Sequence, residues 1–282
     1  MPTTIFYPLG RATLCLLAML LISQQVVWSH EDFLISHNGS KLITGGFDDS
    51  ISGIVDEGPK RVYEFDVEFI NPGMPYNSND PGIQSRPQAE LTSFQALPVG
   101  EDLSFRMLPI TIGASSRNLW YWNGVGAVNF TTLGSNSVLQ LAHPSSLASS
   151  SISGSDNATI AGFLIQSVSS GPDPVHRHLE TTLSTAGGEP AQGIYLASVD
   201  FELTGGLGRS DQAFLVYATV DELGSITEEM HGAAVDWVTA NLLAVESAPG
   251  SSAIPEPSSA LLLGSGLLVL MQACKKKVGK TG

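Results

Sequence analysis

The stretch Arg61-Val62-Tyr63-Glu64-Phe65-Asp66-Val67-Glu68-Phe69-Ile70 decides the fold class of this chain of 282 residues. From Tyr63 onward, apolar residues take every second position and acidic residues lie between them. Successive side chains of a β-strand point to opposite faces of a sheet. The alternation therefore predicts a strand with one buried face and one acidic, solvated face.

Segments of the same kind recur on both sides of that stretch, and turn-forming residues separate them. Apolar runs flank Asn38-Gly39 and Asn123-Gly124, which predicts two β-hairpins. Residues 71–87 are rich in Asn, Pro, Gly and Ser, and residues 144–155 are rich in Ser, so both are predicted to be loops. The predicted strands are 30–37, 41–46, 61–70, 103–112, 119–122, 127–131, 138–141, 158–165, 176–183, 193–203 and 213–220. This series predicts a mainly β fold, an antiparallel sandwich or barrel-like domain.

One amphipathic helix is predicted at the C-terminal end of this domain. Ser225-Ile226-Thr227-Glu228 matches a capping box, with Ser225 as the N-cap residue. The apolar positions that follow fit a helix of about 16 residues. His231 shares a face with Val235 and Val238, so it is expected to be a half-buried helix residue rather than a ligand.

The N-terminal end carries a targeting pattern. Residues 1–29 resemble a signal peptide, because Arg11 precedes an apolar run and small residues suit cleavage after Ser29. His30 would then be the first residue of the mature protein. The cysteines, Cys15 and Cys274, both lie in the end segments, so the domain between them is expected to contain no disulfide and no thiol ligand.

The C-terminal end combines three features in order: Pro255-Glu256-Pro257, an apolar run over residues 260–274, and Lys275-Lys276-Lys277. The run is shorter than the roughly 20 residues that span a hydrocarbon core, and the lysines would stay on the cytoplasmic side. This arrangement resembles the PEP-CTERM sorting signal of Gram-negative bacteria, in which a membrane protease, the exosortase, is thought to process the tail. The resemblance implies export through the Sec machinery, transient membrane anchoring by the C-terminal segment, and a final location in the cell envelope or outside the cell.

The predicted organisation follows from these two ends. It consists of a signal peptide (1–29), a β-rich extracytoplasmic domain (30–245), a linker (246–253) and a sorting signal (254–282) with a short transmembrane segment and a basic tail. The chain has a net charge of −14, and five of its 13 basic residues but only one of its 27 acidic residues lie in the end segments. The domain is therefore strongly acidic, which argues against nucleic acid as a partner and favours cations.

Histidine gives the best candidate for a functional site. His176 and His178 are two residues apart in a predicted strand, where side chains at this spacing share a face about 6.5–7 Å apart. Two such imidazoles can bind one divalent metal ion. His30, with Asp32 and His37 after it, is the first place to look for a further ligand. Imidazole and carboxylate suit zinc, and the free amine of an N-terminal His30 would also suit copper.

Several short motifs occur in a characteristic order along the domain. They are His30-x-Asp32, Lys41-Leu42-Ile43-Thr44-Gly45, Asp80-Pro81-Gly82, Leu103-Ser104-Phe105, Leu119-Trp120-Tyr121-Trp122-Asn123-Gly124, His176-x-His178, Gly193-Ile194-Tyr195-Leu196 and the helix His231–Trp237. This order resembles a family of PEP-CTERM proteins of cyanobacteria and planctomycetes, some of them described as repressed by the zinc uptake regulator. The resemblance implies a secreted β-rich protein linked to zinc supply, and it implies no established enzymatic activity.

Three functions remain open on the sequence. The first is a non-enzymatic protein that binds zinc through His30, Asp32, His37, His176 and His178. The second is a structural protein of the extracellular matrix or cell surface with no ligand. The third is a copper-dependent oxidoreductase that uses an N-terminal His30 and acts on extracellular polysaccharide. The nucleophile elbow, the His-Glu-x-x-His motif and the phosphate-binding glycine loop are all absent from the sequence, so no catalytic residues are predicted.

Overall fold

A computed structural model of the chain describes residues 31–69, 73–186, 188–220 and 224–243. The signal peptide, His30, the linker and the sorting signal that the sequence predicts all lie outside the described residues. The chain divides into two compact units, Met1–Thr239 and Ala240–Gly282, and every strand among the described residues belongs to the first. No helix within the described ranges is long and apolar enough to cross a membrane.

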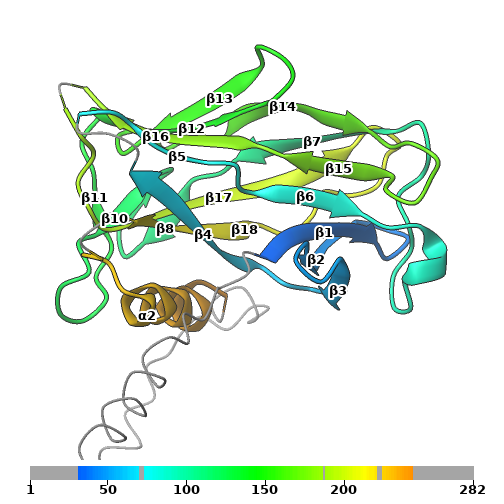
Figure 1. The fold of residues 1–282 in the computed structure, drawn as a ribbon, viewed down its shortest axis with the longest axis horizontal. Coiled ribbons are helices and arrows are strands. Elements are labelled where there is room, and N and C mark those ends of the chain that lie inside the picture. The colour runs from blue at the N-terminus through cyan, green and yellow to red at the C-terminus, as the bar shows by residue number, and fades with distance from the viewer. Residues whose placement is uncertain (1–30, 70–72, 187, 221–223, 244–282) are drawn as a thin grey trace, which may run out of the picture. The chain divides into compact units, whose positions relative to one another are not determined.

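The fold of the first unit is mainly β, as predicted (Figure 1). Its strands are β1 (Glu31–His37), β2 (Leu42–Asp48), β3 (Gly53–Asp56), β4 (Val62–Phe69), β5 (Tyr76–Ser78), β6 (Gly82–Ser85), β7 (Asp102–Met107), β8 (Ile110–Ile112), β9 (Ser115–Arg117), β10 (Trp120–Trp122), β11 (Thr131–Thr132), β12 (Ser137–Ala142), β13 (Ser149–Ser153), β14 (Ile160–Ser167), β15 (Val175–His178), β16 (Glu180–Thr185), β17 (Ile194–Leu203) and β18 (Ala213–Val220). The helical segments are η1 (Gln88–Glu90), α2 (Glu228–Val238) and η2 (Thr239–Leu243).

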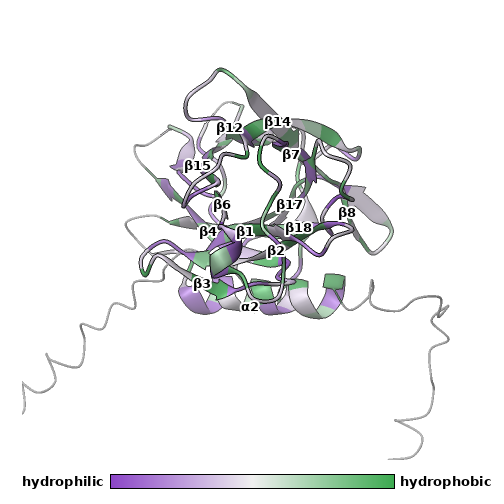
Figure 2. Ribbon diagram, turned by 90° about the vertical axis from the view of Figure 1, so that its right-hand side faces the viewer, coloured by the Kyte–Doolittle hydropathy of each residue, from purple (hydrophilic) through white to green (hydrophobic). Residues whose placement is uncertain are grey.

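The largest sheet has the strand order β11-β10-β17-β18-β4-β5-β16-β12-β13, and β7 joins β14 to β17. This sheet curls, so that β13 and β14 come together although they are not paired as strands. Their contact includes a hydrogen bond of 2.8 Å that Ser150 Oγ donates to the carbonyl of Ala161. The curled shape is visible in Figure 2.

A five-stranded sheet with the order β15-β6-β1-β2-β3 packs its apolar side against the curled sheet. The predicted hairpin around Asn38-Gly39 is confirmed as β1 and β2. The predicted antiparallel arrangement does not hold at two strand pairings, because β1 runs parallel to β6 and β18 runs parallel to β4. These partners are far apart in the sequence, so no tight turn imposes an antiparallel direction on them.

The strand that decides the fold class has the buried face that its alternation predicts, but its acidic face is only partly solvated, because Glu64 and Asp66 are half-buried and α2 packs against β4. Tyr63, Phe65 and Val67 of β4 are buried in the hydrophobic core, whereas Glu68 is exposed. Their core neighbours include Phe33 of β1, whose ring centroid lies 3.8 Å from that of Tyr63. Aromatic and branched side chains from both sheets therefore share one core, which holds the two sheets together.

Both loop predictions are wrong in part. Residues 71–87 include β5 and β6, and residues 144–155 include β13. All four residues of β6 are buried. Strands this short carry too few residues for a periodic pattern, and pairing with neighbouring strands forms them instead, on both sides for β5 and β6 and on one side for β13.

Helix α2 packs against β4 and β18 (Figures 1 and 2). The helix begins after Thr227, whose side chain accepts a hydrogen bond from the amide of Met230. The prediction of Ser225 as the N-cap is therefore wrong by two residues. Helix α2 has 11 residues and η2 follows it directly with 5 more, so the helical segment has the predicted length of about 16 residues. His231 is buried as expected, and its Nε2 lies 2.9 Å from the carbonyl oxygen of Val216.

Candidate metal centre

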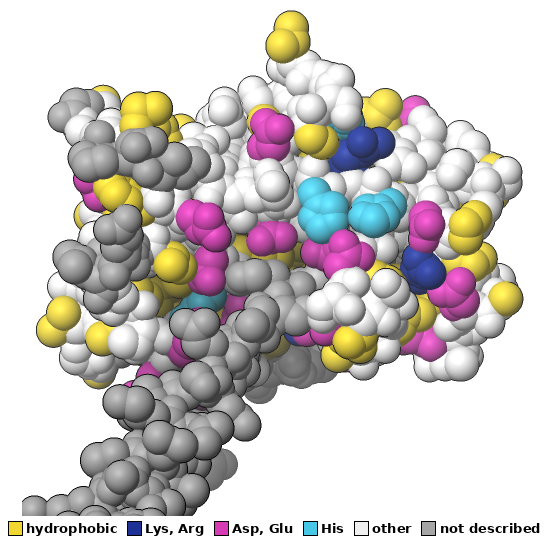
Figure 3. All heavy atoms as spheres, in the orientation of Figure 1, with side chains coloured by type: hydrophobic (Ala, Val, Ile, Leu, Met, Phe, Trp, Pro, Cys, Tyr) yellow, Lys and Arg dark blue, Asp and Glu magenta, His cyan; other side chains and the backbone are white. Residues whose placement is uncertain are grey.

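His176 and His178 both lie on β15, the edge strand of the five-stranded sheet. They share one face of that strand, and their ring centroids are 5.4 Å apart. The side chains are 44 % and 36 % exposed, respectively. Solvent and ions therefore have direct access to both rings, and Figure 3 shows two histidine side chains beside each other on the surface, next to acidic side chains.

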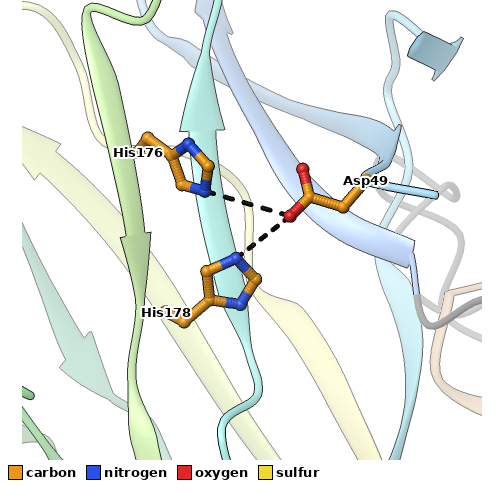
Figure 4. Close-up of side chains that lie close together, drawn as sticks. All are labelled: Asp49, His176 and His178. Carbon is orange, nitrogen blue, oxygen red and sulfur yellow. Dashed lines mark hydrogen bonds and ion pairs between the residues drawn. The ribbon is translucent and has the colours of Figure 1, made fainter. Parts of the chain in front are cut away.

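Asp49 faces the two histidines from the turn between β2 and β3 (Figure 4). Its Oδ2 atom lies 3.3 Å from His178 Nε2 and 3.9 Å from His176 Nε2. The turn is ordered by local bonds, since the amide of Ser50 donates to Asp48 and the amide of Ser52 donates to the carbonyl of Asp49. Two imidazole nitrogens thus converge on one carboxylate oxygen.

Asp32 of β1 approaches His178 across β6, on the same face of the sheet as the histidine. The strand between them carries Gly82, which pairs with His178 in the ladder between β15 and β6. A Cβ atom at Gly82 would lie 2.1 Å from Asp32 Oδ1, so any larger residue would occupy the space of the carboxylate. Without that side chain, Asp32 Oδ2 reaches within 3.8 Å of His178 Nε2.

Gln84, also on β6, connects the two carboxylates. Its Nε2 donates hydrogen bonds to Asp32 Oδ2 at 3.1 Å and to Asp49 Oδ1 at 2.6 Å. Gln84 is 1 % exposed, so its amide is held by packing as well as by these bonds. One amide group therefore aligns a buried carboxylate on a strand with an exposed carboxylate on a turn.

The environment of Asp32 is unfavourable for a negative charge. Burial, and to a smaller extent the charges of Asp49 and Asp80, raise the pKa of this carboxyl group from its ordinary value of 3.8 to a net value of about 6. The hydrogen bond from Gln84 and the proximity of His178 act in the opposite direction. Asp32 is 2 % exposed, which makes it a buried acid whose ionised form lacks a full cationic partner.

Two groups of residues within the described part of the chain have metal-ligand atoms within 4.8 Å of one another. The first, which we call the outer group, consists of Asp49, His176 and His178. The second, the inner group, consists of Asp32, Asp80 and His178. An open hollow of about 510 Å³ adjoins the histidines, and its lining also includes Asn79, Pro144, Arg177 and Glu180.

The structure brings three of the predicted site residues together: Asp32, His176 and His178. His37 is held elsewhere, because its Nε2 lies 3.0 Å from the carbonyl oxygen of Ala96 and its Nδ1 accepts a hydrogen bond from the amide of Gly39. Both of its ring nitrogens are thus engaged by backbone. His30 lies outside the described residues.

Sequence reasoning missed Asp49, Asp80 and Gln84. Asp49 is 129 positions from His178 in the sequence, and it lies in a turn with no pattern that points to a ligand. Asp80 and Gln84 fall in the stretch predicted to be a loop. The Asp80-Pro81-Gly82 motif was the one available signal, because Gly82 is the residue that makes room for Asp32.

Comparisons of the chain with known protein families, with curated proteins and with solved structures found no match. The function is therefore argued from the geometry of the site and from the sequence.

Proposed function

We propose that this chain is an exported, non-enzymatic protein that binds one divalent metal ion, zinc, between Asp49, His176 and His178. The observation that carries the proposal is the convergence of the two Nε2 atoms on Asp49 Oδ2, at 3.9 and 3.3 Å. Nitrogen and carboxylate oxygen are ligands that zinc prefers, and three protein ligands leave a fourth position for water or another molecule.

The distances fit such an ion. Tetrahedral zinc with bonds of about 2.0–2.2 Å holds its ligand atoms roughly 3.3–3.5 Å apart. The separation of His178 Nε2 from Asp49 Oδ2, 3.3 Å, lies in this range. The distance between His176 Nε2 and Asp49 Oδ2, 3.9 Å, is slightly longer. A small rotation of the half-exposed His176 side chain would shorten it.

The charge distribution favours a cation at the same place. Asp32 and Asp49 are hydrogen-bonded to the same neutral amide, that of Gln84, and Asp32 is almost fully buried. An ion bound by the outer group would lie close to both carboxylates and offset their mutual repulsion. The strongly acidic composition of the chain also attracts cations.

Equilibrium dialysis with zinc tests the proposal. The wild-type protein is expected to retain one zinc ion. The His176→Ala and His178→Ala variants are expected to bind zinc at least about tenfold more weakly, since even the loss of a residue that only supports a metal ligand lowers the affinity by that factor. His143→Ala is the matched control, because both ring nitrogens of His143 are bonded to backbone, at Ile165 and Ser145. Equal and negligible uptake by all four proteins would refute the proposal and favour a structural protein of the envelope.

Export and sorting are a separate part of the proposal, and the two end segments of the sequence support them. We propose removal of residues 1–29 by the signal peptidase and processing of the PEP-CTERM tail near Pro255-Glu256-Pro257 by a membrane protease. Mass spectrometry of the protein recovered from the cell envelope and medium tests both cuts. A first residue other than His30 would also remove the amine ligand on which a copper-dependent oxidoreductase would depend.

A further inference from the structure

We infer that the inner group, Asp32, Asp80 and His178, is a second metal position that takes a harder divalent cation such as Mn²⁺, and that it shares His178 with the outer group. The inference rests on the proposed function, because the two positions have one ligand in common. It adds a ligand set and a metal preference that differ from those of the zinc position.

The three inner ligands come from β1, from β15 and from the segment before β6, and they meet near Gly82. Their ligand atoms all lie within 4.8 Å of one another, close enough for a modest inward movement to place them around one ion. Asp80 precedes β6, and Ser78 orients it, because Ser78 Oγ accepts a hydrogen bond from the Asp80 amide and lies 3.2 Å from Asp80 Oδ2. The inner group is thus formed by ordered backbone rather than by a mobile surface turn.

Gly82 provides the space that the Asp32 carboxylate occupies in the inner group. It separates Asp32 from His178 across the sheet, and an added Cβ would overlap the Asp32 carboxylate at 2.1 Å. Asp32 is 2 % exposed, so the fold encloses this carboxylate beside His178. A buried charge in this setting is costly unless it is paired or binds a metal ion.

The chemistry of the two ligand sets differs. The outer group supplies two imidazole nitrogens and one carboxylate, which suit zinc. The inner group supplies two carboxylates and one imidazole, and carboxylate-rich sites suit Mg²⁺, Ca²⁺ and Mn²⁺. Mn²⁺ also accepts imidazole, which makes it the appropriate probe for the inner group.

The two positions exclude one another. The distances from His178 to Asp32 and to Asp49, 3.8 and 3.3 Å, are both measured from Nε2. This nitrogen has a single lone pair, which can bind only one ion at a time. The protein is therefore expected to bind either zinc or Mn²⁺ with one ion per chain, and each metal is expected to displace the other.

Binding of Zn²⁺ and Mn²⁺ by the purified protein tests the inference, with zinc measured by equilibrium dialysis and free Mn²⁺ by electron paramagnetic resonance. His176→Ala is expected to weaken zinc binding at least about tenfold while changing Mn²⁺ binding less than about threefold. Asp80→Asn is expected to weaken Mn²⁺ binding at least about tenfold while changing zinc binding less than about threefold. Asp32→Asn is a second inner variant, which keeps an acceptor for Gln84, and near-UV circular dichroism confirms that each variant folds.

The outcomes separate this inference from the proposed function. If His176→Ala and the inner variants weaken both metals equally, one position exists, so the inference is wrong and zinc binding stands. Two ions bound at once, or zinc binding with no Mn²⁺ binding, would also overturn it. If the wild-type protein binds neither metal, the proposed function itself fails.

Discussion

Asp32→Asn is the most informative change at this centre, because it replaces a buried carboxylate by a neutral group of the same shape. The fold raises the pKa of Asp32 from 3.8 to about 6, mainly through burial. At pH values between these two pKa values, the folded protein keeps a proton on Asp32 that the unfolded chain has lost. The free energy of unfolding of the metal-free wild type therefore falls as pH rises through this window, and the loss is complete above about pH 6.

The size of the effect follows from the same two values. Each pH unit between the unfolded and folded pKa corresponds to about 1.4 kcal/mol, so ionised Asp32 destabilises the metal-free fold by about 3 kcal/mol at pH 7. Asparagine at this position has no charge to bury and still accepts the hydrogen bond that Gln84 Nε2 donates to Oδ2. We therefore expect Asp32→Asn to be more stable than the wild type by up to about 3 kcal/mol at pH 7, and nearly equal to it below pH 4.

Urea unfolding with a metal chelator, followed by tryptophan fluorescence at several pH values from 4 to 7, measures this difference. The other carboxyl groups titrate in both proteins, so their contributions cancel in the comparison. Asp211→Asn is the control, because Asp211 forms an exposed ion pair with Lys41, and its effect is expected to stay below about 1 kcal/mol. An Asp32→Asn variant that is less stable at pH 7, or a difference that does not change with pH, would refute the argument.

Three further predictions concern the surroundings of the site. Gln84→Leu removes the donor that joins Asp32 to Asp49. We expect it to weaken zinc binding about 10–100-fold in equilibrium dialysis, as the loss of a hydrogen bond that orients a metal ligand usually does; unchanged affinity would contradict this role. Gly82→Ala is expected to lower the free energy of unfolding by about 1–3 kcal/mol in a urea titration, because the new methyl group overlaps the Asp32 carboxylate. An unchanged free energy of unfolding would contradict this overlap. Hydrogen bonds from Thr92, Ser93 and Phe94 lower the pKa of Glu57 from 4.5 to about 2. This carboxylate therefore stabilises the fold above pH 4.5, and the stabilisation is lost as pH falls towards 2. Glu57→Gln should reduce stability at pH 7 and match the wild type near pH 2, and an equal difference at both pH values would exclude this explanation.

Local patterns in the sequence were sufficient for much of the fold. The alternation in β4 predicted which side of this strand is buried, because a period of two is a property of the strand itself. The hairpin of β1 and β2 could be predicted because Asn38-Gly39 permits a tight turn between two apolar runs. The pair His176 and His178 was found for the same reason, since residues two apart on a strand share a face.

Other parts of the fold depended on long-range pairing. Strand β6 has only four residues and no alternation, yet β1 and β15 pair with it on its two sides and bury all of it. The parallel pairing of β4 with β18 is likewise set by the shared core and not by any turn. Neither the formation of β6 nor the parallel pairing of β4 with β18 is predicted by a pattern within a single stretch of sequence.

The sequence by itself determined that this is a mainly β protein with two neighbouring histidines on one strand face and an acidic composition. Only the tertiary structure decided which carboxylates meet those histidines. Asp49 and Asp32 come from a turn and from a buried strand, and Gly82 and Gln84 between them control the space and the hydrogen bonds. Such a site depends on the order of strands in the sheet, which results from packing between distant segments and which no single stretch of sequence specifies.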